Sequence, residues 1–194
     1  MNTSGPWIYA LAFLIGYALG SISPAALIAR AKGVSLRETG SGNPGATNVG
    51  RALGVRTGVL VGVLDILKGF IPAIAFAQIG PVAAEVAGLA AVLGHITSPF
   101  LRGRGGKGTA TTLGAILGAQ PLWAIPVLIG FGVGFGVTRR VGIGSIIAAL
   151  VLLVCAVLTG DWDSRTFGVL LALLVVVRHY KNIVAAWRDW RSRT

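Results

Sequence analysis

The sequence predicts an all-α polytopic membrane protein, and three observations lead to this fold class. Apolar residues make up 54% of the 194 residues, and charged residues make up only 12%, about half of the fraction usual in soluble domains. The mean hydropathy is +0.79. The apolar residues also form long runs near the roughly 20 residues that a helix needs to cross a bilayer. A single cysteine, Cys155, excludes an internal disulfide framework.

Five apolar runs are predicted to be spanning helices, because backbone polar groups in lipid must bond within their own segment. These runs cover residues 6–29, 57–78, 82–101, 141–159 and 166–177, the last with a polar continuation. A sixth region, 109–137, contains Gln120-Pro121, where a break is expected because the residue before a proline disfavours helical geometry. We therefore predict about seven helical segments in one domain, 1–194. Region 109–137 forms either two full spans or a short re-entrant hairpin beside five full spans.

Basic residues gather in the connections on one side of these spans, which hold 15 of the 17 Lys and Arg residues. Positively charged loops of membrane proteins stay in the cytoplasm. The N-terminus is therefore predicted to lie outside and the C-terminus in the cytoplasm. The four basic groups are Arg30, Lys32, Arg37, Arg51 and Arg56; Arg102, Arg104 and Lys107; Arg139 and Arg140; and Arg178, Lys181, Arg188, Arg191 and Arg193.

The first polar cluster is the segment 40–51, which combines glycines with neutral donors and one arginine. Glycines let a backbone approach a ligand closely and turn its N–H groups toward an anion. An arginine guanidinium binds phosphate through two parallel hydrogen bonds. The segment is a candidate phosphate site, or simply a glycine-rich turn that starts a helix. Its candidate side chains are those of Ser41, Asn43, Thr47, Asn48 and Arg51.

The second polar cluster, 102–109, has Gly105, Gly106 and Gly108 around Lys107. It differs from the nucleotide-binding P-loop, because Gly108 separates Lys107 from Thr109 and a helix rather than a strand precedes it. Nucleotide hydrolysis is therefore not expected. Cations and backbone donors at a helix start still form an anion site. The alternative is a flexible loop that enters the next helix.

The third polar cluster, 178–182, lies at the inner end of the last helix, where His179 and Asn182 are three residues apart and so are expected on one helical face. A histidine with an ordinary pKa near 6.5 can take or give a proton. The alternative is a histidine at the membrane interface beside snorkelling cations. Few His, Cys and acidic residues are present, so neither a metal site nor a cofactor is predicted.

Two further polar features lie inside the apolar runs. Asp65 and Lys68 are three residues apart on one helix and can neutralise one another, which favours a structural role, although ionisable residues inside a membrane are also functional candidates. His95 precedes the second cluster by about two helical turns, and we expect it to order that cluster rather than react.

Six stretches together resemble, in their order and spacing, the bacterial acyl-phosphate:glycerol-3-phosphate acyltransferases, the PlsY family. They are Gly20-Ser21-Ile22-Ser23-Pro24, 40–51, 65–69, Gly94-His95, 105–108 and 178–182. The resemblance covers nearly the whole chain apart from the variable region 109–137. One departure is Ser-Ile-Ser-Pro at 21–24, where the family pattern has Ser-Ile-Pro.

The resemblance implies an enzyme of the bacterial cytoplasmic (plasma) membrane with its active site on the cytoplasmic side. Such an enzyme transfers a fatty acyl group directly from acyl phosphate to the 1-hydroxyl of glycerol 3-phosphate, without an acyl-enzyme or a cofactor, in phospholipid synthesis. Its products are lysophosphatidate and phosphate. The implied catalytic residues are Ser41, Arg51, His179 and Asn182. The implied substrate-binding residues are Ser41, Arg51, Gly105, Gly106, Lys107, Gly108 and Asn182. To these the neutral donors of the first cluster add Asn43, Thr47 and Asn48 as predicted substrate-binding residues.

The alternative function is a transporter or channel for an organic phosphate, which would also use basic loops and broken helices. A transport path should carry polar residues through to the outer side. The predicted outer connections hold few polar residues, namely Glu85, Asp161, Asp163 and Arg165. The sequence therefore favours the enzyme.

Overall fold

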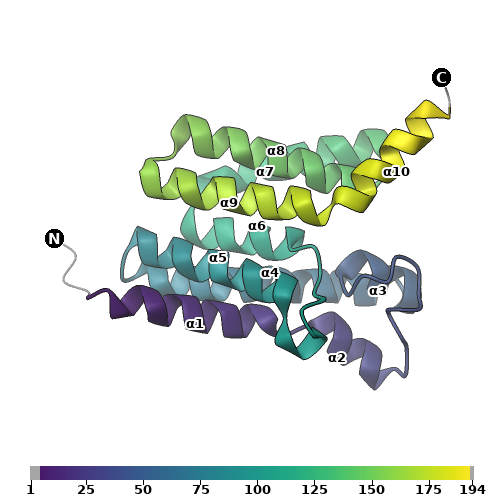
Figure 1. Ribbon diagram of the computed structural model, residues 1–194, viewed down its shortest axis with the longest axis horizontal. Helices are drawn as coiled ribbons and strands as arrows, with labels where there is room; N and C mark the ends of the chain where they lie inside the picture. The colour runs from purple at the N-terminus through teal and green to yellow at the C-terminus, as the bar shows by residue number, and fades with distance from the viewer. Residues whose placement is uncertain (1–4, 193–194) are drawn as a thin grey trace. The chain divides into compact units, whose positions relative to one another are not determined.

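The computed structural model describes residues 5–192, which form ten α-helices and one short 3₁₀ helix and no strand (Figure 1). The all-α prediction is confirmed. Five helices are long and apolar enough to cross a membrane, or six if a bent pair at the C-terminal end counts as one span. The chain divides into two compact units, Met1–Pro121 and Leu122–Thr194, and each is described by itself. The single domain and the sidedness of the termini stay predictions.

Two helices of the first unit, α1 (Trp7–Ser21) and α5 (Pro81–Thr97), are in backbone-to-backbone contact. A Cβ at Gly16 would overlap the carbonyl oxygen of Ala87, and a Cβ at Gly20 would overlap that of Ala91. Small residues give membrane helices this close approach, because van der Waals packing replaces the hydrophobic effect inside lipid. The pair therefore forms a rigid seam through the first unit.

The apolar run predicted over 6–29 is a single candidate span, Trp7–Ala31, but it consists of two helices. Helix α1 ends at Ser21, Ile22 is extended at φ −64° and ψ 127°, and α2 covers Pro24–Ala31. The interruption has a local cause, because the ring of Pro24 disfavours helical geometry at Ser23. The hydroxyl of Ser23 then accepts the backbone N–H of Ala26 at 3.3 Å and caps the second helix.

Helix α4 (Val55–Ala77) packs against α5, the short α3 (Ala46–Leu53) and α6 (Thr109–Ala119). Helix α6 has 11 residues, about 16 Å, which is too short to cross a bilayer alone. The predicted break at Gln120-Pro121 is confirmed, since α6 ends before Gln120 and the next helix begins at Pro121. The Gln120 amide donates to the Glu85 carboxylate at 2.9 Å and fixes that end of α6 to α5.

The second unit contains α8 (Val141–Thr159), α9 (Trp162–Arg178), α10 (Tyr180–Arg191) and nearly all of α7 (Pro121–Thr138). The indole of Trp123 donates to the Thr159 hydroxyl at 2.9 Å. Asp161 caps α9 by accepting the Ser164 backbone N–H at 2.9 Å, and this hydrogen bond lowers the pKa of the Asp161 carboxyl. Helices α9 and α10 meet at a bend of 56° that the sequence did not predict.

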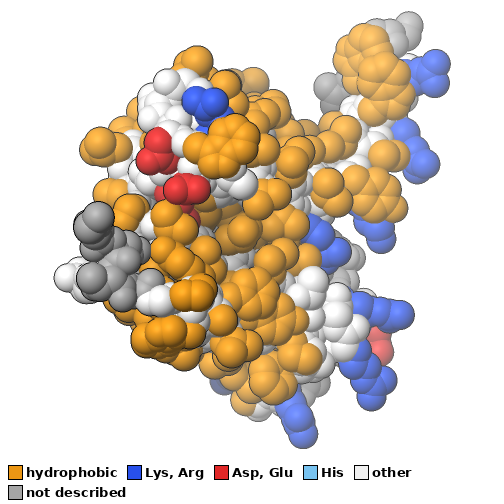
Figure 2. Space-filling view, turned by 60° about the vertical axis from the view of Figure 1, so that its left-hand side comes forward, with side chains coloured by type: hydrophobic (Ala, Val, Ile, Leu, Met, Phe, Trp, Pro, Cys, Tyr) orange, Lys and Arg blue, Asp and Glu red, His pale blue; other side chains and the backbone are white. Residues whose placement is uncertain are grey.

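The surface of the apolar helices is rich in exposed hydrophobic side chains. Leu14, Val59 and Leu158 are 64%, 61% and 75% exposed, and hydrophobic side chains cover much of the face shown in Figure 2. A water-soluble protein rarely exposes apolar surface on this scale. These side chains are therefore suited to contact with lipid.

Candidate active site

The first two polar clusters lie at the same end of the first unit, and Arg37 connects them. Figure 1 shows α2, α3 and the 3₁₀ helix η1 (Pro99–Leu101) at that end. The Arg37 guanidinium donates to the carbonyl oxygen of Gly42 at 3.3 Å and to that of Arg104. One side chain therefore holds segments 40–51 and 102–109, which are far apart in the sequence.

The buried side chain of Asn48 organises the first cluster. Its Oδ1 accepts the backbone N–H of Ser41 at 2.9 Å, and its Nδ2 donates to the carbonyls of Leu36 at 3.1 Å and Thr39 at 2.9 Å. Gly40 has φ 55°, and a Cβ there would lie 2.5 Å from Asn48 Oδ1. Both the left-handed backbone and the lack of space require glycine at this position.

The exposed side chains of the first cluster are those of Ser41, Thr47 and Arg51, while Asn43 is half-buried. Thr47 and Arg51 are four residues apart on α3 and so share one face of it. Helix α3 is held by α4, because a Cβ at Gly58 would lie 2.7 Å from the Cα of Gly50. A short helix packed in this way presents Arg51 from a fixed backbone.

The second cluster is a loop that folds back onto the end of α5. The backbone N–H of Gly105 donates to the carbonyl of Ile96 at 2.9 Å, and that of Gly106 donates to the carbonyl of His95 at 3.2 Å. A Cβ at Gly105 would overlap the His95 carbonyl oxygen, and a Cβ at Gly106 would overlap Nε2 of the His95 ring. These glycines are required by the close approach of the loop to His95.

The loop ends at Gly108, which has φ 86° and is the N-cap of α6. Lys107 is half-buried just before it. Among the described residues no hydrogen-bond partner exists for the buried hydroxyl oxygen of Thr109, the first residue of α6. The cationic side chain and the first turn of α6 therefore form the helix-start arrangement that suits a bound phosphate.

The third cluster lies in the second unit, where His179 ends α9 and caps α10. The ring is buried, and its Nδ1 lies 2.8 Å from the carbonyl oxygen of Val175. A carbonyl only accepts hydrogen bonds, so Nδ1 carries the hydrogen and Nε2 is the nitrogen that can accept a proton. The site thus fixes the tautomer that a general base requires.

Asn182 lies in the first turn of α10, and its backbone N–H donates to the carbonyl of His179 at 2.8 Å. We expected His179 and Asn182 on one face of a continuous helix, but a bend of 56° separates α9 from α10 at His179. The bend follows from the backbone of His179, at φ −99° and ψ 8°. The amide of Asn182 instead packs over Gly142 near the start of α8, where a Cβ would overlap its Nδ2.

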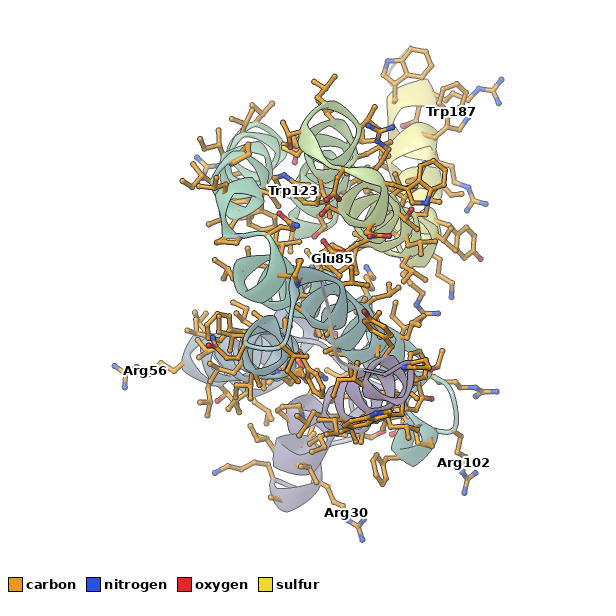
Figure 3. All side chains as sticks on the ribbon, turned by 90° about the vertical axis from the view of Figure 1, so that its left-hand side faces the viewer. Arg30, Arg56, Glu85, Arg102, Trp123 and Trp187 are labelled. Carbon is orange, nitrogen blue, oxygen red and sulfur yellow. The ribbon has the colours of Figure 1, made fainter. Side chains whose placement is uncertain are left out.

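Arg140 and Asp189 fix α10 to the start of α8 through a salt bridge of 2.7 Å. In the first unit, by contrast, Arg30, Arg56 and Arg102 point away from the helices (Figure 3). No group of three His, Cys, Asp or Glu side chains that could hold a metal ion occurs within residues 5–192. The groups that these residues offer to an anion are cationic side chains and backbone donors.

Sequence reasoning did not single out Arg37 or Gly142 as parts of the site. Arg37 appeared only as one of many basic residues, and its two carbonyl partners lie 5 and 67 residues away. Gly142 is one of 29 glycines, and its neighbour Asn182 lies on another helix. No local pattern identifies either residue, because both act through tertiary contacts.

Comparisons with known proteins place this chain in one family. The family model described as glycerol-3-phosphate acyltransferase matches residues 10–189, which includes residues of both units. The glycerol-3-phosphate acyltransferase of Geotalea daltonii is 42% identical over 177 residues, which is 89% of this chain and 91% of the relative. That of Aquifex aeolicus is 41% identical over 177 residues, which is 88% of this chain and 91% of the relative.

Two solved structures share the fold. The crystal structure of PlsY (YgiH), an integral membrane glycerol 3-phosphate acyltransferase, in its glycerol 3-phosphate form has a TM-score of 0.88 and 39% identity over 93% of this chain and 92% of that chain. Its lysophosphatidic acid form has a TM-score of 0.85 and 38% identity, with the same coverage. The present chain is an integral membrane protein and belongs to the glycerol-3-phosphate acyltransferase family.

Proposed function

We propose that this protein transfers a fatty acyl group from an acyl phosphate to the 1-hydroxyl of glycerol 3-phosphate. The products are lysophosphatidate and inorganic phosphate. The observation that carries the proposal is the junction of two glycine-rich basic loops through Arg37. The relatives named for glycerol 3-phosphate acyl transfer, and the bound forms of the matched structure, support the acceptor and the product.

Phosphate binding is assigned to charged and polar groups from all three clusters. Arg51, Lys107 and Asn182 hold the phosphates of the two substrates and orient the attacking hydroxyl. The backbone N–H groups of Lys107 and Gly108 stabilise the negative charge that develops on the acyl carbonyl oxygen. Those of Gly105 and Gly106 hold the loop instead, because they donate to the carbonyls of Ile96 and His95. Ser41, Asn43 and Thr47 supply neutral hydrogen bonds. Asn48 acts by holding the loop, because its amide already bonds three backbone groups.

The transfer needs no acyl-enzyme, because an acyl phosphate is a mixed anhydride with a good leaving group. The 1-hydroxyl oxygen attacks the acyl carbonyl carbon and forms the new ester bond. The bond from that carbon to the bridging phosphate oxygen breaks, and phosphate leaves with the electron pair. The hydroxyl proton goes to Nε2 of His179, or to a substrate phosphate that His179 positions.

The proposed location is the bacterial cytoplasmic membrane, with the reacting groups on the cytoplasmic side. The bias of Lys and Arg toward one set of loops supports this orientation. Within the first unit the two basic loops share one end. Within the second unit, Arg140 and the basic helix α10 are joined by the salt bridge between Arg140 and Asp189. Labelling of residue 106 or 179 from outside intact cells would contradict the orientation.

The direct test is a product assay with the purified protein in detergent. We expect palmitoyl phosphate and glycerol 3-phosphate to give lysophosphatidate without any CoA thioester. Palmitoyl-CoA in place of palmitoyl phosphate is the control, and we expect no product from it. Product from the thioester alone would refute the proposed donor, and proteoliposome flux of glycerol 3-phosphate without acylation would favour the transporter.

Replacing Arg37 is expected to separate the two loops of the first unit. Arg37→Ala should lower kcat/KM about tenfold, a size typical of losing two exposed charged hydrogen bonds. Arg37→Lys should restore little, because one ammonium group does not match a planar fork that binds two carbonyls. Arg30→Ala is the matched control, since Arg30 points away from the helices (Figure 3). Equal kcat/KM for Arg37→Ala and Arg30→Ala would contradict the bridging role.

Gly142→Ala is expected to displace Asn182 in the second unit, because the added Cβ would overlap the Asn182 amide. A displacement of about 1 Å in a positioning group can cost about a hundredfold in rate, so kcat/KM should fall between tenfold and a hundredfold. Gly136→Ala is the control, because a Cβ there meets no atom within 4 Å. Steady-state assays of both variants check the prediction, and unchanged kinetics in Gly142→Ala would remove Asn182 from the site.

A further inference from the structure

Three ionisable side chains are buried together directly beneath the second loop. Lys68 and Asp65 on α4 form an ion pair of 3.0 Å, and Nδ1 of His95 on α5 lies 3.5 Å from the same Asp65 oxygen. Their exposed fractions are 9%, 3% and 7%. We call these three residues the buried ionic cluster. Its His95 end faces the loop, because Nε2 occupies the space that a Cβ at Gly106 would need.

The other end of the buried ionic cluster is anchored at the break between α1 and α2. Lys68 Nζ donates to the carbonyl oxygen of Ile22 at 2.8 Å. The hydroxyl of Ser98 donates to the adjacent carbonyl of Ser21 at 2.6 Å, and the carbonyl of Ser98 accepts the backbone N–H of Gly103 at 2.9 Å. Residues 21 and 22, at the break between α1 and α2, therefore connect to the second loop by two routes, one through Ser98 and one through the buried ionic cluster.

Stability alone does not explain such a cluster. Removing charges from water costs several kcal/mol per ion, and well-packed hydrophobic residues are often at least as stabilising as a buried ion pair. The ion pair does set an orientation, because Asp65 lies between the Lys68 ammonium at 3.0 Å and Nδ1 of the His95 ring at 3.5 Å. It therefore fixes the orientation of the ring on which Gly106 rests.

We propose that Lys68, Asp65 and His95 are positioning residues that hold residues 105–107 in the conformation that binds a substrate phosphate. The inference rests on the proposed function and adds residues that do not touch substrate. Asp65 sets the direction of the His95 ring, and the ring supports Gly106 from below. Lys107 and the start of α6 at Gly108 are then in place for the phosphate before it binds.

The test compares His95→Leu, His95→Gln, Asp65→Asn and the double variant Asp65→Asn/His95→Leu in detergent. The KM values for palmitoyl phosphate and for glycerol 3-phosphate are measured in turn. We expect His95→Leu and Asp65→Asn to raise the KM for one of them, the substrate whose phosphate binds this loop, about tenfold or more, with a smaller change in kcat. The KM for the other substrate should change less. The KM of the double variant should be no higher than that of the poorer single variant, because both substitutions break the same contact between Asp65 and His95. Equal KM values in His95→Leu and the unmodified protein would overturn the proposal, and so would additive losses.

The matched control is Glu85→Gln, which alters another buried polar residue on α5. Glu85 lies ten residues from His95, about 15 Å along the helix, and contacts Gln120. We expect its KM values to match those of the unmodified protein. A merely structural role for His95 would lower the melting temperature of His95→Leu and leave KM unchanged in the molecules that stay folded.

His95→Gln keeps the proposal testable if His95→Leu does not fold. The Gln amide can place a polar group near the former Nε2. The KM of His95→Gln should therefore lie below that of Asp65→Asn/His95→Leu. A KM in His95→Gln as high as that of the double variant would count against the role of Nε2. Binding of glycerol 3-phosphate, measured without acyl donor, separates the two proposals. An unmodified protein that binds none would refute the proposed function, whereas unaltered binding and KM values in His95→Leu would refute only the positioning role.

Discussion

Gly106→Ala is expected to lower kcat/KM by about a hundredfold or more, since misplacement of a binding group by about 1 Å has effects of this size. The added Cβ would overlap Nε2 of the buried His95 ring. The ring cannot retreat, because Asp65 lies on its other side at 3.5 Å. The loop must therefore move, and it carries Lys107 and the backbone donors with it. Steady-state kinetics with both substrates varied in turn measure the loss.

Gly33→Asn is the control for a glycine replacement in a basic connection. Gly33 has φ 67°, and a Cβ there meets no atom within 4 Å. Asparagine tolerates the left-handed region better than other residues with a side chain, so kcat/KM should stay near that of the unmodified protein. A Gly106→Ala enzyme with normal KM for both substrates would exclude the loop from phosphate binding.

His179→Ala is expected to lower kcat by about a hundredfold to ten-thousandfold, the range that a positioned general base contributes. The structure commits Nδ1 to the Val175 carbonyl at 2.8 Å, which leaves Nε2 as the proton acceptor. Val177→Ala is the control, because Val177 is 65% exposed on the same helix. Normal turnover in His179→Ala would remove His179 from the reaction.

Two conservative variants distinguish the roles proposed for His179. The Asn side chain in His179→Asn can keep the bond to Val175 but has no group at the Nε2 position. The Gln side chain in His179→Gln can place an amide near the Nε2 position but cannot take a proton at neutral pH. Activity that survives in His179→Gln alone assigns the proton to a substrate phosphate that His179 positions. Loss of activity in both variants assigns the proton to His179.

The helical spans were predictable because each depends on apolar composition over a long stretch. The run 141–159 coincides with α8 (Val141–Thr159), and Gln120-Pro121 marks the end of α6. The interruption at Ile22 was missed, although Pro24 stands two residues later. Pro72 lies inside the continuous helix α4, so a proline in an apolar run does not by itself predict a break.

The candidate residues could be named from the sequence, but the contacts that connect them could not. Gly105, Gly106 and Gly108 were predicted as substrate-binding residues, and the fold shows that Gly105 and Gly106 lie against His95 whereas Gly108 lies against Val92 and Ile96. Asn48 was predicted as a substrate ligand because its side-chain amide is a neutral hydrogen-bond donor. Only the fold shows that its three hydrogen bonds go to Ser41, Leu36 and Thr39. The bend at His179 lies in the backbone of that residue, at φ −99° and ψ 8°, which no local sequence pattern marks.

The seam between α1 and α5 divides the first unit into positions with opposite mutational tolerance. Leu14 is 64% exposed, so it can exchange with other apolar residues as membrane composition changes. Gly16 cannot, because any Cβ meets the backbone of Ala87 and no rotamer relieves that overlap. In a deep mutational scan selected for growth, each turn of α1 should therefore combine freely variable positions on one face with a nearly invariant position on the opposite face. The pattern would trace the helix contact without any structural measurement.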